Sequence, residues 1–168
     1  MKQINTHSRV LWITQGAVIA ALYVVLTIVF QPISFGPVQV RISEILTILP
    51  LFTSAAVPGL FVGCILANIL GGAIVWDVIF DSIATLIGAV AAYYLRFNRW
   101  LVPLPPIAAN ALIVPFVLWY GYGITDISIY YMMLYVAAGE VVSCYILGEI
   151  LATVLTKYKK VIFENNGN

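Results

Sequence analysis

Ionisable side chains stand inside strongly apolar segments of this chain, at spacings that would let them act together. Asp77 and Asp81 are four residues apart, so in a helix they share one face, although Asp77 could instead stabilise the dipole of a helix start. Arg41 and Glu44 are three residues apart, so they can pair with each other or reach a common cavity. Glu140 lies near the middle of the last apolar segment. Charged groups at membrane depth are costly and usually functional, so these residues predict a binding site.

Amide and aromatic side chains accompany the charged ones. Asn68 and Asn110 lie in apolar segments, and each can both donate and accept hydrogen bonds. Most of the tryptophans and tyrosines are typical of membrane interfaces, but one or two, such as Trp76, could stack on a flat ligand. The pattern predicts an outward-facing cavity with excess negative charge. Such a cavity suits a small planar solute that donates hydrogen bonds, in a neutral or cationic form.

Sequence signatures of catalysis do not occur in the chain. There is no GxxxxGK(S/T) phosphate-binding loop, no HExxH and no GxSxG motif. Cys64 and Cys144 lack metal-ligand spacing, and His7 stands alone, so we expect two buried thiols and no metal or other cofactor. The chain is predicted not to be an enzyme. If it transports a solute uphill, the energy must come from an ion gradient or a partner.

The composition indicates that lipid surrounds most of the chain. Apolar residues make up 62% of it and charged residues 9%, whereas soluble domains carry about 25% charged residues. The apolar runs are long and do not alternate, which favours membrane-spanning helices over a β-barrel. The net charge of +1, with KYKK as the one basic cluster, does not predict nucleic-acid binding.

We predict an all-α, polytopic membrane protein, a single integral domain over residues 1–168, with six transmembrane helices and both termini cytoplasmic. The helices are expected at residues 10–30, 42–54, 58–75, 77–95, 103–120 and 127–156. Residues 31–41 contain two prolines and a glycine and are predicted to form an outer loop. This topology places on one side the basic residues Lys2, Arg9, Arg96, Arg99, Lys157, Lys159 and Lys160, as cytoplasmic segments require. Arg41 alone falls on the other side, which favours a role in the site.

Small residues recur four positions apart in several predicted helices. Ala17 and Ala21 do so in the first helix, and Gly59 and Gly63 do so in the third. Helices in lipid associate through close backbone approach across small residues. These stripes predict packing within the chain or, for the first helix, docking of another membrane protein.

The segment QPISFGPVQVRISEILTILPLFTSAAVPGLFVGCILANILGG, followed by WDVIFDSIATLIGAV, resembles the QueT family of queuosine-precursor transporters. The resemblance extends from about residue 12 to the end of the last predicted helix, and residues 31–87 are its most specific part. QueT proteins are similar to the substrate-binding S-components of energy-coupling factor (ECF) transporters, which are ABC transporters. S-components have six helices and both termini inside.

The resemblance implies capture of a 7-deazapurine, above all 7-aminomethyl-7-deazaguanine, from outside a bacterial plasma membrane for ATP-driven uptake. The partners implied are a membrane-embedded coupling (T) protein and two cytoplasmic ATPases. Ala17 and Ala21 would dock the coupling protein, and residues 31–41 would form a lid over the solute.

The resemblance also implies roles for the acids and amides. Glu140 or Asp81 would accept the N–H donors of the guanine edge. Asn110 and Asn68 would add hydrogen bonds.

The remaining predicted site residues would complete the cavity. Asp77 or Glu44 would neutralise the ammonium group. Arg41 would orient Glu44 or donate to the solute carbonyl, and Trp76 or an outer tyrosine would stack on the ring.

Other interpretations of the same residues stay open. The chain could be an S-component for another vitamin-like solute. It could be a stand-alone, cation-coupled secondary transporter in which Asp77, Asp81 and Glu140 form a relay. It could also be a membrane scaffold without a ligand.

Overall fold

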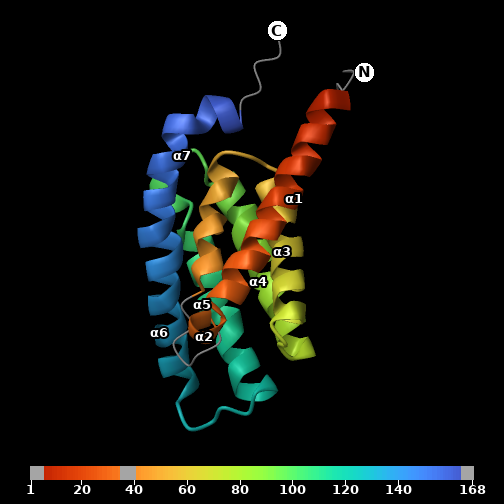
Figure 1. Ribbon diagram of the computed structural model, residues 1–168. Helices are drawn as coiled ribbons and strands as arrows, with labels where there is room; N and C mark the ends of the chain where they lie inside the picture. Colours follow the sequence, from red (N-terminus) through yellow and green to blue (C-terminus); the bar gives the residue numbers. More distant parts are fainter. Residues whose placement is uncertain (1–5, 35–40, 164–168) are drawn as a thin grey trace.

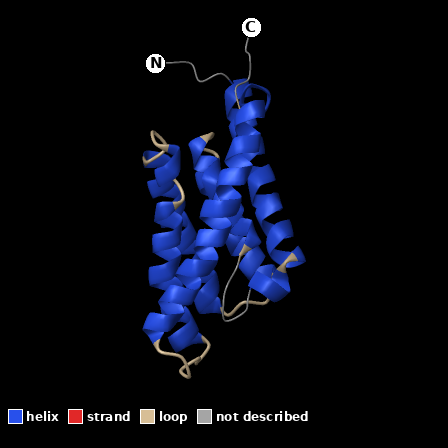
Figure 2. Ribbon diagram, turned by 90° about the vertical axis from the view of Figure 1, so that its left-hand side faces the viewer, coloured by secondary structure: helices blue, strands red, loops and turns tan. Residues whose placement is uncertain are grey.

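The computed structural model describes residues 6–34 and 41–163, and every regular element over these residues is helical (Figures 1 and 2). Four helical segments are long and apolar enough to cross a membrane: Ser8–Val29, Val75–Tyr94, Arg99–Gly121 and Ile129–Lys159. Two shorter apolar helices, Ile42–Leu51 and Ala56–Leu70, lie between the first two of these in the sequence. The predicted all-α class is confirmed, whereas the number of membrane crossings stays a prediction.

Most of the predicted helices start and end within a few residues of the observed ones. The first half of the chain forms α1 (Thr6–Val29), α2 (Gln31–Ser34), η1 (Ile42–Leu51), α3 (Ala56–Leu70) and α4 (Val75–Tyr94). The predicted loop 31–41 therefore begins with a short helix, and its residues 35–40, like Lys2, lie outside the described residues. The helix predicted to run to residue 75 ends at Leu70, because Gly72 adopts a positive φ of 76° in the turn that follows.

The second half of the chain departs from ideal α-helix in two places. It forms η2 (Arg99–Leu101), α5 (Leu104–Phe116), η3 (Val117–Gly121), α6 (Ile129–Glu140), η4 (Val141–Leu147) and α7 (Gly148–Ile162). Both η3 and η4 are π-helical, and η3 follows Pro115, which lacks the N–H that an α-helix would use. Wide turns of this kind are frequent at functional sites, and η4 begins directly after Glu140.

The short helix η1 is a 3₁₀ helix of ten residues, although such helices rarely exceed four. Side chains three residues apart eclipse in this geometry, so Arg41, Glu44 and Thr47 follow one line along it. The Thr47 hydroxyl donates to the Glu44 carbonyl oxygen at 2.6 Å. Because η1 packs against α1, α4, η4 and α7, it carries two predicted site residues into the centre of the protein.

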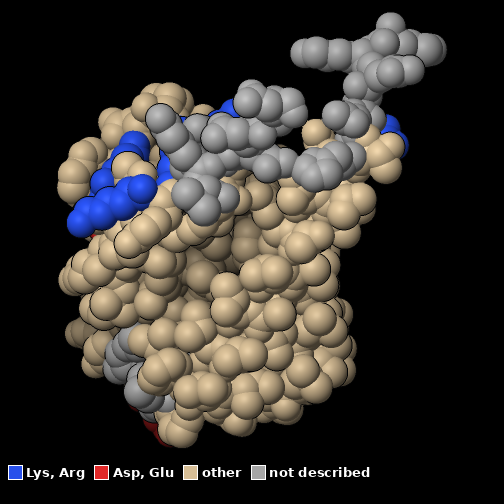
Figure 3. All heavy atoms as spheres, turned by 45° about the horizontal axis from the view of Figure 1, so that its top comes forward, with Lys and Arg blue, Asp and Glu red and all other residues tan. Residues whose placement is uncertain are grey.

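The start of α1 and the end of α7 lie at the same end of the molecule (Figure 1). The Gln15 amide nitrogen donates to the Ile162 carbonyl oxygen there, at 3.2 Å. Arg99, between α4 and α5, contacts α7 through an ion pair of 2.5 Å with Glu149 and a hydrogen bond of 2.5 Å to Thr153. Figure 3 shows basic side chains gathered at this end. The grouping agrees with the predicted sidedness, and which face is cytoplasmic stays a prediction.

Small residues allow α1 and α3 to pack closely, as the sequence spacing of Gly59 and Gly63 predicts. A Cβ atom added to Gly59 would lie 2.7 Å from the Gly16 carbonyl oxygen. One added to Gly63 would lie 2.8 Å from the Cβ atom of Tyr23 and 3.0 Å from the Cα atom of Ala20. The backbones are therefore too close for any side chain at these two glycines.

Gly63→Ala is expected to lower the free energy of unfolding by about 1–3 kcal/mol, because the new methyl group forces α1 away from α3. Denaturant unfolding in detergent, followed by tryptophan fluorescence, measures this loss. Gly148→Ala is the matched control, since its new Cβ would lie 3.7 Å from the Ile48 Cβ atom, an ordinary van der Waals contact. The control should change stability by less than about 0.5 kcal/mol. Equal losses in the two variants would contradict the close packing of α1 on α3.

Candidate functional site

Seven of the eight predicted site residues are buried between the helices, each with at most 3% of its surface exposed. They are Arg41, Glu44, Asn68, Asp77, Asp81, Asn110 and Glu140. They come from η1 and the residue before it, and from α3, α4, α5 and α6. The tertiary structure divides them into two groups.

The first group is built around Arg41, and we call it the arginine group. The Arg41 guanidinium donates to the Asp81 carboxylate and lies 3.9 Å from an Asp77 oxygen. The Asn68 amide also donates to Asp81, at 2.7 Å, and the Cys64 thiol does so at 3.1 Å. Asp81 therefore has three donors, one of them charged. The sequence left open a pair between Arg41 and Glu44, but among the described residues Arg41 forms its ion pairs with the two aspartates.

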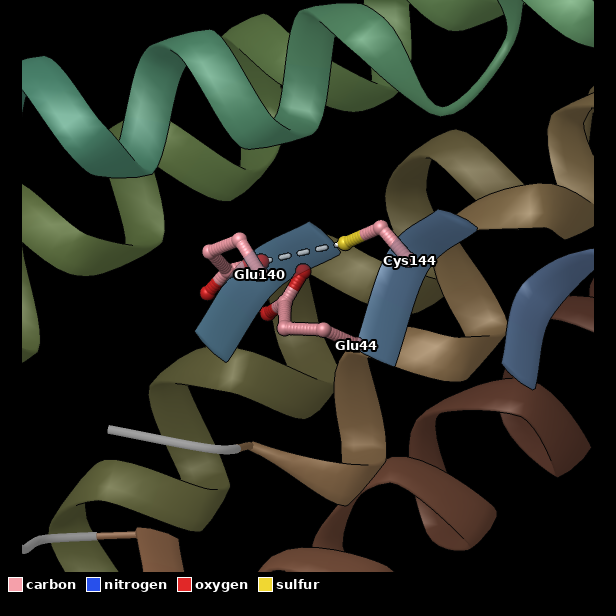
Figure 4. Close-up of side chains that lie close together, drawn as sticks. All are labelled: Glu44, Glu140 and Cys144. Carbon is pink, nitrogen blue, oxygen red and sulfur yellow. Dashed lines mark hydrogen bonds between the residues drawn. The ribbon is translucent and has the colours of Figure 1, made fainter. Parts of the chain in front are cut away.

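The second group, the glutamate group, contains Glu44, Glu140, Cys144, Asn110 and Tyr23. One carboxylate oxygen from each glutamate and the Cys144 sulfur lie within 4.8 Å of one another (Figure 4). The Tyr23 hydroxyl donates to Glu44, and the Cys144 thiol donates to Glu140 at 3.0 Å. The Asn110 amide lies close to both carboxylates without reaching hydrogen-bonding geometry. The donors are neutral, and neither glutamate forms an ion pair with a described residue.

Several buried polar atoms of both groups have no hydrogen-bond partner among the described residues. They are Glu44 Oε2, Asp77 Oδ1, Asp81 Oδ1 and both polar atoms of the Asn110 amide. Each unpaired group of this kind costs about 1–3 kcal/mol. A polar guest that donates several hydrogen bonds would compensate this cost, so the unpaired atoms are what a solute site requires.

Trp76 lies apart from both groups, with 59% of its surface exposed. It stacks on Phe80, with ring centroids 6.0 Å apart. Both rings line an apolar groove of about 670 Å³ between α4, α5 and η3, and none of the acids lines it. Successive side chains of an α-helix point about 100° apart, so the inward direction of Asp77 turns its neighbour Trp76 outward.

Four residues of the cluster were not recognised from the sequence as site residues: Tyr23, Cys64, Cys144 and Tyr122. The thiols are buried as predicted, but both also donate to carboxylates. Tyr122, grouped in the sequence with the interfacial aromatics, donates to an Asp77 oxygen at 3.0 Å. Burial, followed by the nearby Asp77 carboxylate, raises the pKa of Tyr122, so it remains a donor at neutral pH. The sequence signal that could have identified Tyr23 is its hydroxyl group inside an apolar helix, because a buried hydroxyl needs a hydrogen-bond partner.

Comparison with known proteins adds to this geometry. The family model described as QueT transporter matches residues 13–157. The chain belongs to the QueT family. A relative from Lactococcus lactis subsp. cremoris, named Queuosine precursor transporter QueT, is 38% identical over 103 residues. That alignment covers 60% of this chain and 57% of the relative, so the match spans little more than half of the relative's length. No solved structure matches the chain.

Membership of the QueT family confirms the resemblance seen in the sequence. Together with the four long apolar helices, it identifies a multi-pass membrane protein of a transporter family. It also favours transport over catalysis as the work of the buried polar cluster.

Proposed function

We propose that this QueT-family chain is the substrate-binding (S) component of an ECF-type ABC transporter. It captures a queuosine precursor, 7-aminomethyl-7-deazaguanine or a related 7-deazapurine, from outside the bacterial plasma membrane. The observation that carries the proposal is the buried cluster of four acids and two amides with unpaired polar atoms. The name of the Lactococcus relative supports the choice of solute.

The chemistry of the cluster suits this solute. A 7-deazaguanine presents adjacent N–H donors on its pyrimidine edge, and its aminomethyl group is a cation at neutral pH. Carboxylates accept paired N–H donors and ammonium groups well. Glu140 or Asp81 would accept the edge donors, with Asn68 and Asn110 adding hydrogen bonds. Because Trp76 lies outside the cluster, stacking would fall to another aromatic residue.

The energy for uptake would come from a coupling (T) protein and two cytoplasmic ATPases, since the sequence has no nucleotide-binding motif. Ala17 and Ala21 are exposed on α1, whereas Gly16 and Ala20 of the same helix pack against α3. We propose this exposed pair as the docking face for the coupling protein. The distribution of basic residues supports a topology with both termini cytoplasmic.

Protein purified from a bacterial membrane is expected to carry a 7-deazapurine that mass spectrometry of the extracted small molecules identifies. Calorimetry should then show one binding site for 7-aminomethyl-7-deazaguanine and no binding of adenine, whose edge lacks the paired donors. Absence of any bound or titratable 7-deazapurine would refute the proposed solute. Uptake into vesicles that contain this chain alone would instead favour a stand-alone secondary transporter.

A further inference from the structure

The two groups of acids differ in how their negative charge is compensated. In the arginine group, both aspartates form ion pairs with Arg41, and Asp81 also accepts from Asn68 and Cys64. In the glutamate group, the donors to the two carboxylates among the described residues are an uncharged hydroxyl and a thiol. Two carboxyl groups thus lie together at the centre of the protein without an ion pair to any described residue.

Three unpaired atoms point to a guest in the glutamate group. Glu44 Oε2 and both polar atoms of Asn110 have no hydrogen-bond partner among residues 6–34 and 41–163. Glu44 is completely buried and Asn110 is 1% exposed. Both residues, with Glu140, come from three different elements, η1, α5 and α6, so the arrangement is shared between helices. Figure 4 shows the two carboxyl groups and the thiol turned toward one another.

We infer that Glu44, Glu140 and Asn110 form the subsite for a positively charged amino group of the solute. Arg41 holds the two aspartates, and the unpaired Asp81 Oδ1 is then the acceptor for the donors of the guanine edge. An ammonium group has three N–H donors. Glu44 Oε2, a Glu140 oxygen and Asn110 Oδ1 can accept one each. Its charge also compensates carboxylates in an apolar interior, where opposite charges attract far more strongly than in water.

This inference rests on the proposed function and narrows it, because it names the feature of the solute that the protein selects. A neutral guest would bring no positive charge to stabilise the ionised form of either glutamate. The aminomethyl form of 7-deazaguanine carries a cation, whereas the nitrile form offers neither a charge nor a donor at that position. The subsite therefore selects the aminomethyl form.

A divalent metal ion is the competing occupant, since the two carboxylates and Cys144 could all be ligands. The thiol, however, donates a hydrogen bond to Glu140 and so keeps its proton, whereas a metal requires the thiolate. The hydrogen bond keeps Cys144 in the role of a neutral donor and favours the organic cation.

The test is calorimetry of the full chain in detergent with 7-aminomethyl-7-deazaguanine and with 7-cyano-7-deazaguanine. The unaltered protein should bind the aminomethyl compound at least about tenfold more tightly, a comparison that needs no variant. Glu44→Gln and Glu140→Gln, which keep the side-chain shape, should each weaken that binding at least about tenfold and the nitrile compound less than about threefold. Glu149→Gln, the same change at a glutamate outside both groups that pairs with Arg99, should leave the preference unchanged.

The outcomes separate the inference from the proposed function. If the unaltered protein binds both compounds equally or prefers the nitrile, or if the glutamine variants lose both equally, the subsite is wrong and the transporter proposal stands. If it binds neither, the proposed function fails and the inference falls with it. Stoichiometric binding of zinc that Cys144→Ser abolishes would also overturn the inference and assign a metal site.

Discussion

Arg41→Met is expected to lower the free energy of unfolding by about 3–5 kcal/mol, because it leaves Asp77 and Asp81 as buried carboxylates without a cation. Methionine nearly fills the volume of the arginine stem, so the loss reports the charge more than a cavity. Both aspartates are at most 1% exposed, so water cannot replace the guanidinium without opening the bundle. Denaturant unfolding in detergent micelles, followed by tryptophan fluorescence, measures the effect.

Two further variants test the cause. Arg96→Met removes an exposed arginine that lies over the Tyr93 ring, and it should cost less than about 1 kcal/mol. Adding Asp81→Asn to Arg41→Met should recover part of the stability, because it removes one of the two buried carboxylates that are left without a cation. A loss below about 1 kcal/mol for Arg41→Met alone would show that the arginine group is not a buried ion-pair network.

Ala17→Trp is expected to abolish uptake of the precursor while leaving its binding unchanged. Ala17 and Ala21 are exposed on α1, so a large side chain there obstructs a partner without entering the polar cluster. Uptake is measured in vesicles reconstituted with the coupling protein and the ATPases. Calorimetry on the isolated variant measures solute binding.

Ala20→Trp is the matched comparison on the same helix. Ala20 is 7% exposed and lies against Gly63 of α3, so the larger ring should reduce stability and binding as well as uptake. Ile79→Trp, on the exposed face of α4, controls for an added tryptophan at a lipid-facing position. Normal uptake by the Ala17 variant would contradict docking through α1, and a loss of binding would place Ala17 within the fold's own packing.

The fold class could be predicted from sequence because lipid leaves so few solutions. With 9% charged residues and long apolar runs, the backbone must satisfy its own hydrogen bonds, and helices do so within one segment. The members of the polar cluster could also be predicted, because exposing a polar group to lipid costs free energy. Seven of the eight residues chosen as site residues proved to be buried, since an ionisable side chain in an apolar helix has to turn inward or find a partner. Trp76 carried no such cost, and it faces outward.

Which acid pairs with which base was decided only by the tertiary structure. Arg41 and Glu44 are neighbours on one helical line, yet Arg41 pairs with aspartates about 40 positions away in the sequence. The 3₁₀ form of η1 and the π-helical turns after Glu140 and Phe116 set the rotation of each helix, and of these only the turn after Phe116 has a local signal, Pro115. Tyr23 entered the cluster because α1 approaches α3 across Gly59 and Gly63.

The sequence by itself thus determined that these polar groups are buried, through the free energy of transfer to lipid. Their division into a compensated and an uncompensated group depended on contacts between distant helices, which exist only once the bundle has packed.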